Sequence, residues 1–311
     1  MFIRNSETLQ EILVTATRAL GAAMPYHDAR LQAELLLART LGTTRAMVLA
    51  RLGEILAPDV AAQYAANVAR RAQHEPLAYI LGHQEFYGLD FLVDRRVLIP
   101  RHETEMLVEL ALRHAPRVPH ASPVVVDVGT GSGALALVFA HHLPHAHIFA
   151  TEISSDALVI ARANAARLNL DGRVMFLQGD LLALLAQPFD ILVANLPYIP
   201  SARFDRLPRE IRDYEPRVAL DGGEDGLAVM RRLLARLEAH ATRGAVAFLE
   251  IPEEQGAAAV ELCQRQFPRA PVLLHCDLEG LDRVVEVRWT DDDRPPTAGK
   301  LRRSTVGSRR S

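Results

Sequence analysis

The sequence predicts an α/β protein in which a mostly parallel, doubly wound, Rossmann-like sheet follows a small helical domain. Apolar, strand-like segments alternate with helical patterns between residues 103 and 290, as in successive βαβ units. A glycine-rich turn at residues 129–133 follows the first of these segments and opens a helix, which is typical of nucleotide-binding sheets. Residues 1–84, in contrast, show helical periodicity and no strand-like segment.

The bulk composition is that of a globular protein long enough for two domains. The chain has 311 residues, of which 49% are hydrophobic and 23% are charged. This length exceeds that of one average domain. The net charge of −3 creates no general attraction for nucleic acid. We therefore expect recognition by local shape and chemistry, and no direct binding of nucleic acid.

Several features favour a cytoplasmic protein. Cys263 and Cys276 are the two cysteines, and the twelve residues between them match neither a zinc spacing nor a disulfide framework. The N-terminus has no basic stretch followed by an apolar run, so no signal peptide is expected. No apolar stretch reaches the ~20 residues that span a bilayer. We expect a cytoplasmic monomer that does not contact membranes.

The first expected helix begins after Thr8. Thr8 and Glu11 have the spacing of a capping box, in which each side chain caps the other's backbone. Apolar residues then recur at the spacing of one helical face. These residues are Leu9, Ile12, Leu13 and Ala16.

Three further helices are expected before residue 84. Asp28 is expected to cap the second helix, which Gly42 ends. A third, short helix runs toward Gly53, and Pro58 suits the first position of a fourth. Taken alone, residues 1–84 resemble a small helical bundle without evident chemistry. Residues 85–102 then change character, because the segments 86–93 and 97–100 are short, apolar and aromatic. They predict a β-hairpin that links the two domains.

The second domain is expected to span residues 103–290. Its strands are expected at residues 124–126, 148–151, 174–177, 191–194, 246–250, 272–274 and 284–288. Helical patterns separate most of these segments, for example at residues 154–168 and 227–241. Residues 291–311 hold Pro, Gly, Ser, Lys and Arg and almost no apolar residue, so we expect a disordered tail.

The turn at residues 129–133 indicates a nucleotide-like ligand. Its glycines let the backbone turn tightly and approach a ligand, but they suit NAD and S-adenosylmethionine alike. Asp127 favours S-adenosylmethionine, because a carboxylate there would repel a pyrophosphate and suit an ammonium and a sulfonium. Glu152, at the end of the next strand, can accept both hydroxyls of a ribose. Asp180, at the end of the third strand, can bind the amino group of adenine.

Asn195, Leu196, Pro197 and Tyr198 follow the fourth strand, at the edge of the sheet where ligands bind. An amide nitrogen is a poor nucleophile, so a site that methylates it must hold the NH2 group in line with the methyl donor. The Asn195 side-chain oxygen and the Leu196 carbonyl can both accept hydrogen bonds from such a group. Pro197 favours an extended Leu196, and the Tyr198 ring offers a flat face to a planar substrate.

These residues resemble the Asn-Pro-Pro-Tyr class of methyltransferases, and residues 6–290 are similar to the release-factor glutamine N5-methyltransferases. The supporting motifs occur in one order along the chain. They are PLAYILG at residues 76–82, EFYG at 85–88, IPRHETE at 99–105, LDGGEDGL at 220–227 and DLEGLDRV at 277–284.

The resemblance implies a helical N-terminal domain that docks the substrate, a hairpin linker and a seven-stranded methyltransferase domain. It implies methyl transfer from S-adenosylmethionine to the glutamine of the Gly-Gly-Gln motif of class I peptide-chain release factors. Residues 195–198 would hold the glutamine amide, Glu152 the ribose, and Asp180 and Leu181 the adenine. The loop that would bind the cofactor consists of Gly129, Thr130, Gly131, Ser132 and Gly133.

Four positions depart from the family pattern. Leu196 replaces the first proline of the motif, which keeps the carbonyl and removes a rigid ring. Glu152 stands where Asp is usual, and so carries the same charge on a longer side chain. His102 and Pro252 replace a proline and a glycine, respectively. None of these changes removes a group that methyl transfer requires.

Other functions are compatible with parts of the pattern. An adenine N6-methyltransferase would act on a similarly planar nitrogen, but it needs a basic target-binding region. Methylation of a glutamine in a ribosomal protein is a second alternative. The related enzymes that act on a ribosomal protein differ from this sequence in the segment that matches residues 101–105, so this alternative is disfavoured. A binding module that has lost turnover and an NAD-dependent oxidoreductase are the remaining hypotheses. No metal site is expected, since the histidines of residues 141–147 read as a surface turn and residues 221–225 lack a calcium-loop spacing.

Overall fold

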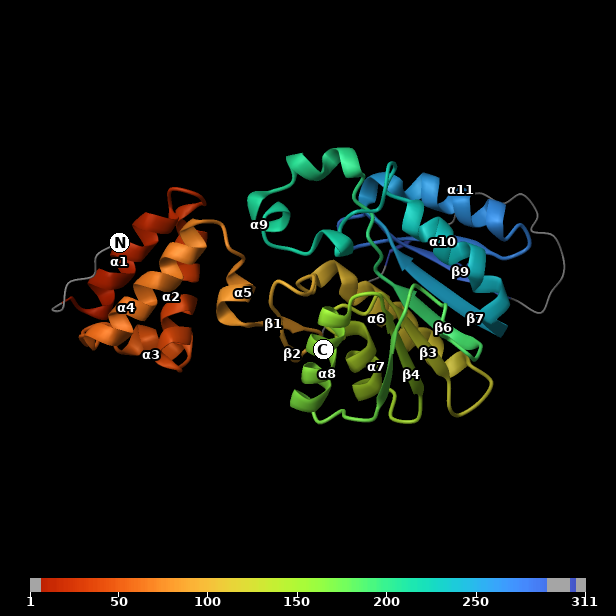
Figure 1. Ribbon diagram of the computed structural model, residues 1–311, viewed down its shortest axis with the longest axis horizontal. Coiled ribbons are helices and arrows are strands. Elements are labelled where there is room, and N and C mark those ends of the chain that lie inside the picture. The colour runs from red at the N-terminus through yellow and green to blue at the C-terminus, as the bar shows by residue number, and fades with distance from the viewer. Residues whose placement is uncertain (1–6, 290–302, 306–311) are drawn as a thin grey trace. The chain divides into compact units, whose positions relative to one another are not determined.

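The computed structural model describes residues 7–289 and 303–305 (Figure 1). The chain divides into two compact units, of which the first comprises Met1–His83 and Pro208–Tyr214. The second unit comprises Gln84–Leu207 and Glu215–Ser311. The expected hairpin linker thus falls within the second unit. The short segment at residues 208–214 joins the first unit, which the sequence did not lead us to expect.

The first unit is a helical bundle. Its helices are α1 (Leu9–Leu20), α2 (Tyr26–Leu41), α3 (Arg45–Ala50), α4 (Pro58–Ala72), α5 (Leu77–Leu81) and α9 (Arg209–Arg212). The capping box of Thr8 and Glu11 is confirmed, and Gly42 ends α2 in the left-handed conformation. The expected cap at Asp28 is wrong, because α2 begins at Tyr26 and Asp28 lies within its first turn. A carboxylate there still meets the positive end of the helix dipole.

The returning segment is held in the helical unit by polar contacts. Arg71 is 7% exposed, and its guanidinium donates to the Glu210 carboxylate at 3.0 Å. The Tyr214 hydroxyl donates to the carbonyl of Gln73 at 2.9 Å. A buried guanidinium requires such partners, because an unpaired buried charge is strongly destabilising.

The second unit begins with a hairpin of β1 (His83–Phe86) and β2 (Leu89–Leu92). Tyr87 and Gly88 form its turn with positive φ angles of 50° and 78°. The expectation that residues 97–100 form the second strand is wrong. The Val97 N–H instead closes a turn on the Asp94 carbonyl at 3.1 Å. The short β1–β2 turn already pairs the hairpin strands, so the apolar residues that follow are free to pack elsewhere.

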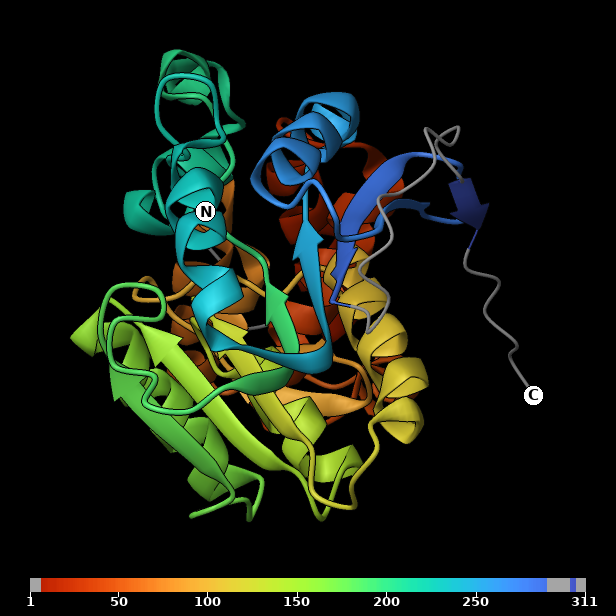
Figure 2. The same ribbon diagram turned by 90° about the vertical axis from the view of Figure 1, so that its right-hand side faces the viewer.

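All seven predicted strands of the second unit are confirmed. They are β3 (Val124–Val128), β4 (His147–Glu152), β5 (Val174–Gln178), β6 (Phe189–Ala194), β7 (Ala241–Glu250), β8 (Val272–Cys276) and β9 (Asp282–Arg288). The sheet order is β10-β8-β9-β7-β6-β3-β4-β5, in which β10 is Arg303–Thr305. The pairs from β5 to β7 are parallel, and β9 runs antiparallel to both β7 and β8. Figure 2 shows the strands side by side, from green β5 to blue β9.

Helices cover both faces of this sheet. They are α6 (Glu105–His114), α7 (Ala134–His142), α8 (Ser155–Arg167), α10 (Ala228–Leu237) and α11 (Gly256–Gln266). Alternate strand residues point to opposite faces, so Val125 packs with α6 and α7, whereas Val126 packs with α10 and α11. Figure 1 shows α10 and α11 on one side of the strands and α6 and α7 on the other. Burial on both faces explains why the strands are almost continuously apolar.

Short 3-10 helices connect several elements. They are η1 (His102–Thr104), η2 (Ala115–Arg117), η3 (Ser201–Arg206), η4 (Arg217–Ala219), η5 (Glu238–His240) and η6 (Glu253–Gln255). The expected disordered tail lies mostly outside the described residues. Its described part, β10 (Arg303–Thr305), pairs in parallel with β8, which the composition did not predict. Among the described residues, no helix has the length and apolar character to cross a membrane.

Candidate functional site

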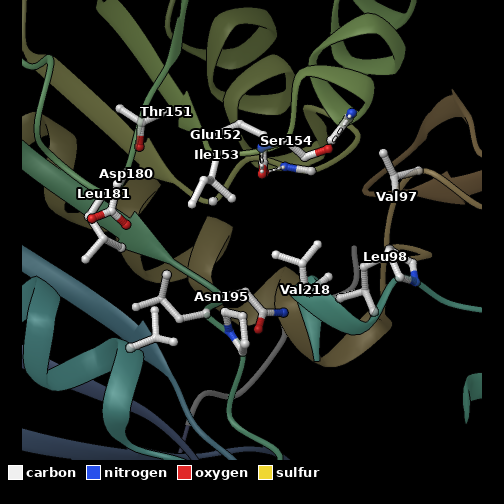
Figure 3. A pocket seen from close by; sticks show the side chains of 18 of the residues that line it. Val97, Leu98, Thr151, Glu152, Ile153, Ser154, Asp180, Leu181, Asn195 and Val218 are labelled. Carbon is white, nitrogen blue, oxygen red and sulfur yellow. Dashed lines mark hydrogen bonds between the residues drawn. The ribbon is translucent and has the colours of Figure 1, made fainter. Parts of the chain in front are cut away.

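A cleft opens at the carboxyl ends of β3, β4 and β6, the edge at which parallel sheets bind ligands. The space within it, including its open mouth, is about 830 Å³. Figure 3 shows Glu152, Ile153 and Ser154 along one side, with Asn195, Val218 and Leu98 opposite. The sequence-predicted residues that line it are Gly129, Gly131, Glu152, Asp180, Leu181, Asn195, Leu196 and Pro197.

The glycine loop forms one wall of the cleft, and its path requires glycine. Gly129, Gly131 and Gly133 have φ angles of 78°, 56° and 83°, a region that other residues rarely adopt. A Cβ added at Gly133 would lie 3.2 Å from the Cβ of Ala161 in α8. The third glycine therefore permits close packing of helices, whereas the first two bring the backbone to the cleft.

Asp127 lies beneath this loop and does not line the cleft. Its carboxyl is 1% exposed and accepts from the Thr130 hydroxyl at 2.6 Å and the Ala136 N–H at 3.1 Å. Burial raises the pKa of Asp127 to about 7. The sequence suggested direct contact with a cationic ligand, whereas the structure gives Asp127 the task of holding the loop. Thr130, Ser132 and Gly133 likewise shape the loop without lining the cleft.

Glu152 connects the loop to the end of β4. Its two carboxylate oxygens accept from the N–H groups of Gly131 and Ser154, both at 2.9 Å. A carboxylate has about four acceptor positions, so both oxygens can accept further hydroxyl groups. The position therefore suits the two hydroxyls of a ribose, as the sequence indicated. Glu152 lines the cleft although its side chain is longer than that of the aspartate usual at this position.

Asp180 and Leu181 close one end of the cleft, as Figure 3 shows. The Asp180 carboxylate pairs with Arg232 of α10, and its backbone carbonyl accepts from Arg236 at 3.0 Å. Leu181 has a positive φ of 53° and is 8% exposed. The arginine partners were not foreseen, because nothing in the α10 sequence distinguishes them from the other charges on a solvated helix face.

Asn195 stands at the opposite side of the cleft, directly after β6. Its Nδ2 donates to the Thr104 hydroxyl oxygen at 3.0 Å. Within residues 7–289 and 303–305, no hydrogen bond to its Oδ1 is formed. The Asn195 carbonyl oxygen would lie 4.0 Å from a Cβ added at Gly129, so the glycine loop and this segment are neighbours. The site therefore offers one oriented amide oxygen beside the glycine loop.

Tyr198 is placed differently from the sequence-based expectation. It is not among the residues that line the cleft. Burial raises the pKa of the Tyr198 phenol to about 12, and the nearby Glu250 carboxyl acts in the same direction. The half-buried ring therefore does not form a wall of the cleft in this structure.

A glycine-rich turn supports the backbone of Pro197 and Tyr198 from behind. A Cβ added at Gly222 would lie 2.7 Å from the Pro197 carbonyl oxygen, and one at Gly226 would lie 2.3 Å from the Tyr198 carbonyl oxygen. The Gln255 side chain also donates to the Tyr198 carbonyl at 3.2 Å. The motif at residues 220–227 did not indicate that its glycines are needed for contact with this segment.

Several cleft residues escaped the sequence analysis. Val97 and Leu98 were read as a strand, although they instead line the cleft. Ile153 and Ser154 follow the predicted ribose acid directly, so their position in the chain was the available signal. The other unforeseen lining residues are Arg96, Thr151, Ala157, Gly179, Pro216, Val218, Ala219, Val229 and Arg232.

A cluster that could hold a metal ion lies at the hairpin and outside the cleft. Ligand atoms of Glu85, His102 and Glu105 lie within 4.8 Å of one another. The Glu105 carboxylate accepts from the Tyr87 N–H at 3.1 Å, and Glu85 accepts from the Gly88 N–H at 2.5 Å. These bonds explain the cluster as support for the strained hairpin turn.

The donor set of the cleft fits S-adenosylmethionine better than a dinucleotide. Glu152 and Asp180 place two carboxylates in the cleft. The arginines of the lining are already paired, Arg96 with Asp94 and Arg232 with Asp180. A pyrophosphate in this cleft would be repelled by the two carboxylates and would find only arginines whose charge is already paired. A cationic ligand with a ribose and an adenine would instead find acceptors for its hydroxyl and amino groups.

Two domain families match the sequence. One, described as the PrmC N-terminal domain, matches residues 11–82, and the other, described as a methyltransferase domain, matches residues 119–220. A release factor glutamine methyltransferase from Moorella thermoacetica is 47% identical over 258 residues, which cover 83% of this chain and 90% of that relative. One from Geobacter sulfurreducens is 42% identical over 274 residues, covering 86% and 93%, respectively.

Solved structures share the fold at much lower identity. The hMettl16 catalytic domain in complex with MAT2A 3'UTR hairpin 6 has a TM-score of 0.53 and 17% identity, covering 74% of this chain and 84% of that chain. A likeness at this identity shows the methyltransferase fold alone.

Proposed function

Since the chain belongs to the release factor glutamine methyltransferases, we propose that it methylates the glutamine of the Gly-Gly-Gln motif in class I peptide-chain release factors. The methyl group of S-adenosylmethionine goes from its sulfur to the side-chain amide nitrogen, which loses one hydrogen, giving N5-methylglutamine, S-adenosylhomocysteine and a proton. The observation that carries this proposal is the amide of Asn195, which is oriented by Thr104 and lies beside the glycine loop at the same cleft.

The cofactor is held by the sheet edge formed by β3, β4 and the end of β5. Gly129 and Gly131 offer backbone, Glu152 takes the ribose hydroxyls, and Asp180 with Leu181 receives the adenine. Asp127 acts indirectly, through its hydrogen bonds within the glycine loop. When bound, S-adenosylmethionine supplies a methyl group on a positively charged sulfur.

The acceptor amide is held by Asn195 and Leu196. The glutamine nitrogen is weakly nucleophilic because its lone pair is delocalised into the carbonyl group. The protein must therefore hold the NH2 group in position, and no side chain need remove a proton from it before attack. Asn195 Oδ1 and the Leu196 carbonyl accept its two N–H groups and favour the positive charge that develops on nitrogen. A rigid pair of acceptors also fixes the distance and direction from the glutamine nitrogen to the methyl group. Such positioning can account for a large part of the rate acceleration of a group transfer.

Leu196 keeps this arrangement although the family motif has proline at its position. The Leu196 side chain is 6% exposed, and its Cδ2 would lie 3.6 Å from a Cβ added at Gly129. Burial of the side chain against the glycine loop restricts the residue in place of the ring. Pro197 restricts it further from the other side.

The acceptor is a protein that docks, in this proposal, on the helical unit, and the enzyme acts as a monomer. Nucleic acid is not the expected acceptor, because the net charge of −3 provides no general attraction for it. The likeness to an RNA-bound methyltransferase domain, at 17% identity, concerns the fold alone and does not favour that alternative.

Labelled S-adenosylmethionine, purified enzyme and a class I release factor test the proposal directly. We expect one methyl group per release factor, mapped by peptide mass spectrometry to the glutamine of its Gly-Gly-Gln motif. A release factor in which this glutamine is replaced by alanine is the matched control and should take up no label. Labelling of RNA or DNA, with an unlabelled release factor, would overturn the assignment.

A further inference from the structure

A chain of three polar side chains leads from the buried Glu250 through the buried Thr104 to the half-buried Asn195 at the cleft. Asn195 Nδ2 donates to Thr104 Oγ1 at 3.0 Å, and the Thr104 hydroxyl faces the carboxyl of Glu250 closely enough to lower the pKa of that carboxyl. Thr104 is 6% exposed and Glu250 is 4% exposed. A carboxyl buried this deeply costs free energy, and the cofactor contacts do not explain why it is present.

The topology of the sheet brings these residues together. In the parallel pairing of β6 with β7, Ala194 lies opposite Leu249. Asn195 and Glu250 are the next residues along their chains, so they end neighbouring strands. Thr104 comes from η1, which is 91 residues away from Asn195 in sequence. The contact therefore belongs to the tertiary structure and to no local motif.

The hydrogen count along this chain decides which way the Asn195 amide points. A threonine hydroxyl has one hydrogen, and an ionised carboxylate can only accept. When Glu250 is ionised, the Thr104 hydrogen is used there, and Thr104 offers Asn195 only a lone pair. The amide must then turn its NH2 group toward Thr104, which leaves Oδ1 as its free acceptor.

We propose that Thr104 and Glu250 are positioning residues that orient the Asn195 amide so that its Oδ1 can accept from the substrate NH2 group. This inference rests on the proposed methylation of a glutamine amide. The reversed amide would present NH2 to the NH2 of the glutamine, and two donors cannot form a hydrogen bond. Orientation of one amide thereby decides whether the acceptor is held at all.

Protonation of Glu250 reverses the direction of the hydrogen bonds between Glu250, Thr104 and Asn195. Burial raises the pKa of Glu250 to about 7. A protonated Glu250 can donate to Thr104, whose own hydrogen is then available for Asn195 Oδ1. The charged and titratable groups that face Glu250 are Arg101 and Glu103, which precede α6, Arg283 of β9, and Tyr198. The methylation rate is therefore expected to rise with pH through about 7.

Kinetics of three variants test the positioning roles. Thr104→Val should lower kcat about tenfold, as expected for one misplaced hydrogen bond. Glu250→Gln should lower kcat less, because its amide can either accept from Thr104 or donate to it. Thr104→Ser retains the hydroxyl and should stay within about threefold of the wild type. In Glu250→Gln the rise of kcat through pH 7 should disappear, because no carboxyl titrates at this place.

Matched controls separate this role from general damage. In the helical unit, Thr40 accepts from Asn67 Nδ2 at 3.2 Å, which is the same pair of groups outside the cleft. Thr40→Val should leave kcat unchanged. Asp127→Asn removes the other carboxyl whose pKa is raised to about 7 and should retain the pH-dependent rise of kcat. Wild-type kcat and pH profile in Thr104→Val and Glu250→Gln would overturn the proposal, as would an equal loss of S-adenosylhomocysteine affinity.

The side-chain 15N–1H signals of Asn195 provide a readout that needs no acceptor protein. They are assigned by their absence in Asn195→Ala. We expect them to shift with pH near 7 in the wild type and to be insensitive to that pH change in Glu250→Gln. If release factors are not methylated but these shifts occur, the proposed function fails and the orienting chain stands. If methylation occurs and the pH dependence of the Asn195 signals is the same in the wild type and in Glu250→Gln, the orienting role of Thr104 and Glu250 is refuted instead.

Discussion

The glycine loop after β3 and the segment after β6 are neighbouring sides of one cleft and are fixed by different means. The loop presents backbone, and its shape depends on glycines at positive φ angles together with the buried Asp127. The segment after β6 presents a side-chain amide, whose direction depends on Thr104 and Glu250. Each side has a buried carboxyl with its pKa raised to about 7 and one oxygen without a partner in the described residues.

This difference separates binding from chemistry. A backbone wall can bind a cofactor whichever way a nearby side chain points, because its donors and acceptors are fixed by φ and ψ. An amide side chain can rotate, so only a hydrogen-bond partner with one allowed role can orient it. Variants of the loop should therefore change affinity and stability, whereas variants of the Asn195 side should change the rate.

The largest effect is expected for Asn195→Ala. Removing its Oδ1 removes one of two acceptors for the glutamine amide, so kcat should fall by about 10²–10³, as when one preorganised hydrogen-bonding group is deleted elsewhere. Calorimetric affinity for S-adenosylhomocysteine should stay within about threefold, since the loop is unchanged. A loss of cofactor affinity as large as the loss of kcat would contradict this prediction, because Asn195 would then contribute to cofactor binding as well as to the rate.

A smaller effect is expected for Gly226→Ala, which moves the acceptor segment without changing its chemistry. The new Cβ would meet the Tyr198 carbonyl oxygen at 2.3 Å, so the backbone must shift. We expect kcat to fall by about tenfold to 10²-fold, the usual cost of slight misplacement. Gly172→Ala is the matched control, since Gly172 has φ +74° with nothing within 4 Å of the added Cβ. Equal kinetics for the two variants would argue against support of this segment by the turn.

The smallest effect on the rate is expected for Asp127→Asn, whose main consequence should be a change in the pH dependence of stability. The native Asp127 keeps its proton to about pH 7, whereas the unfolded group releases it near 3.8. Between these values the native state binds more protons, so this carboxyl lowers the unfolding free energy as pH rises. Asp127→Asn should remove that contribution, so its stability relative to the wild type should change between pH 4 and 7 and be constant at higher pH.

Urea unfolding of the cofactor-free protein at several pH values measures this contribution. Asp94→Asn is a suitable comparison, because Arg96 holds the pKa of Asp94 below its usual value and the sign is opposite. The native Asp94 carboxyl adds stability above pH 3.8, and this stability is lost as pH falls. A pH-independent difference between Asp127→Asn and the wild type would show that burial does not hold a proton on Asp127.

The limits of sequence-based reasoning are visible in the hairpin and in the cleft. The apolar segments at residues 86–93 and 97–100 look alike in composition, but a strand also needs a partner, and the β1–β2 turn provides one for the first segment only. Asp127 illustrates the same limit. Its place at a strand end was clear from the sequence, whereas its position beneath the loop depends on the path of the glycines.

The amino-acid sequence alone determined the seven strands, the glycine turn at residues 129–133 and the amide-bearing segment at residues 195–198. These features follow from periodicity and backbone preference, which act between residues close in the chain. Only the tertiary structure decided that Thr104 lies between Asn195 and Glu250, and that Gly222 and Gly226 support Pro197 and Tyr198. Such contacts depend on the register between β6 and β7 and on the packing of distant turns, which no local pattern encodes.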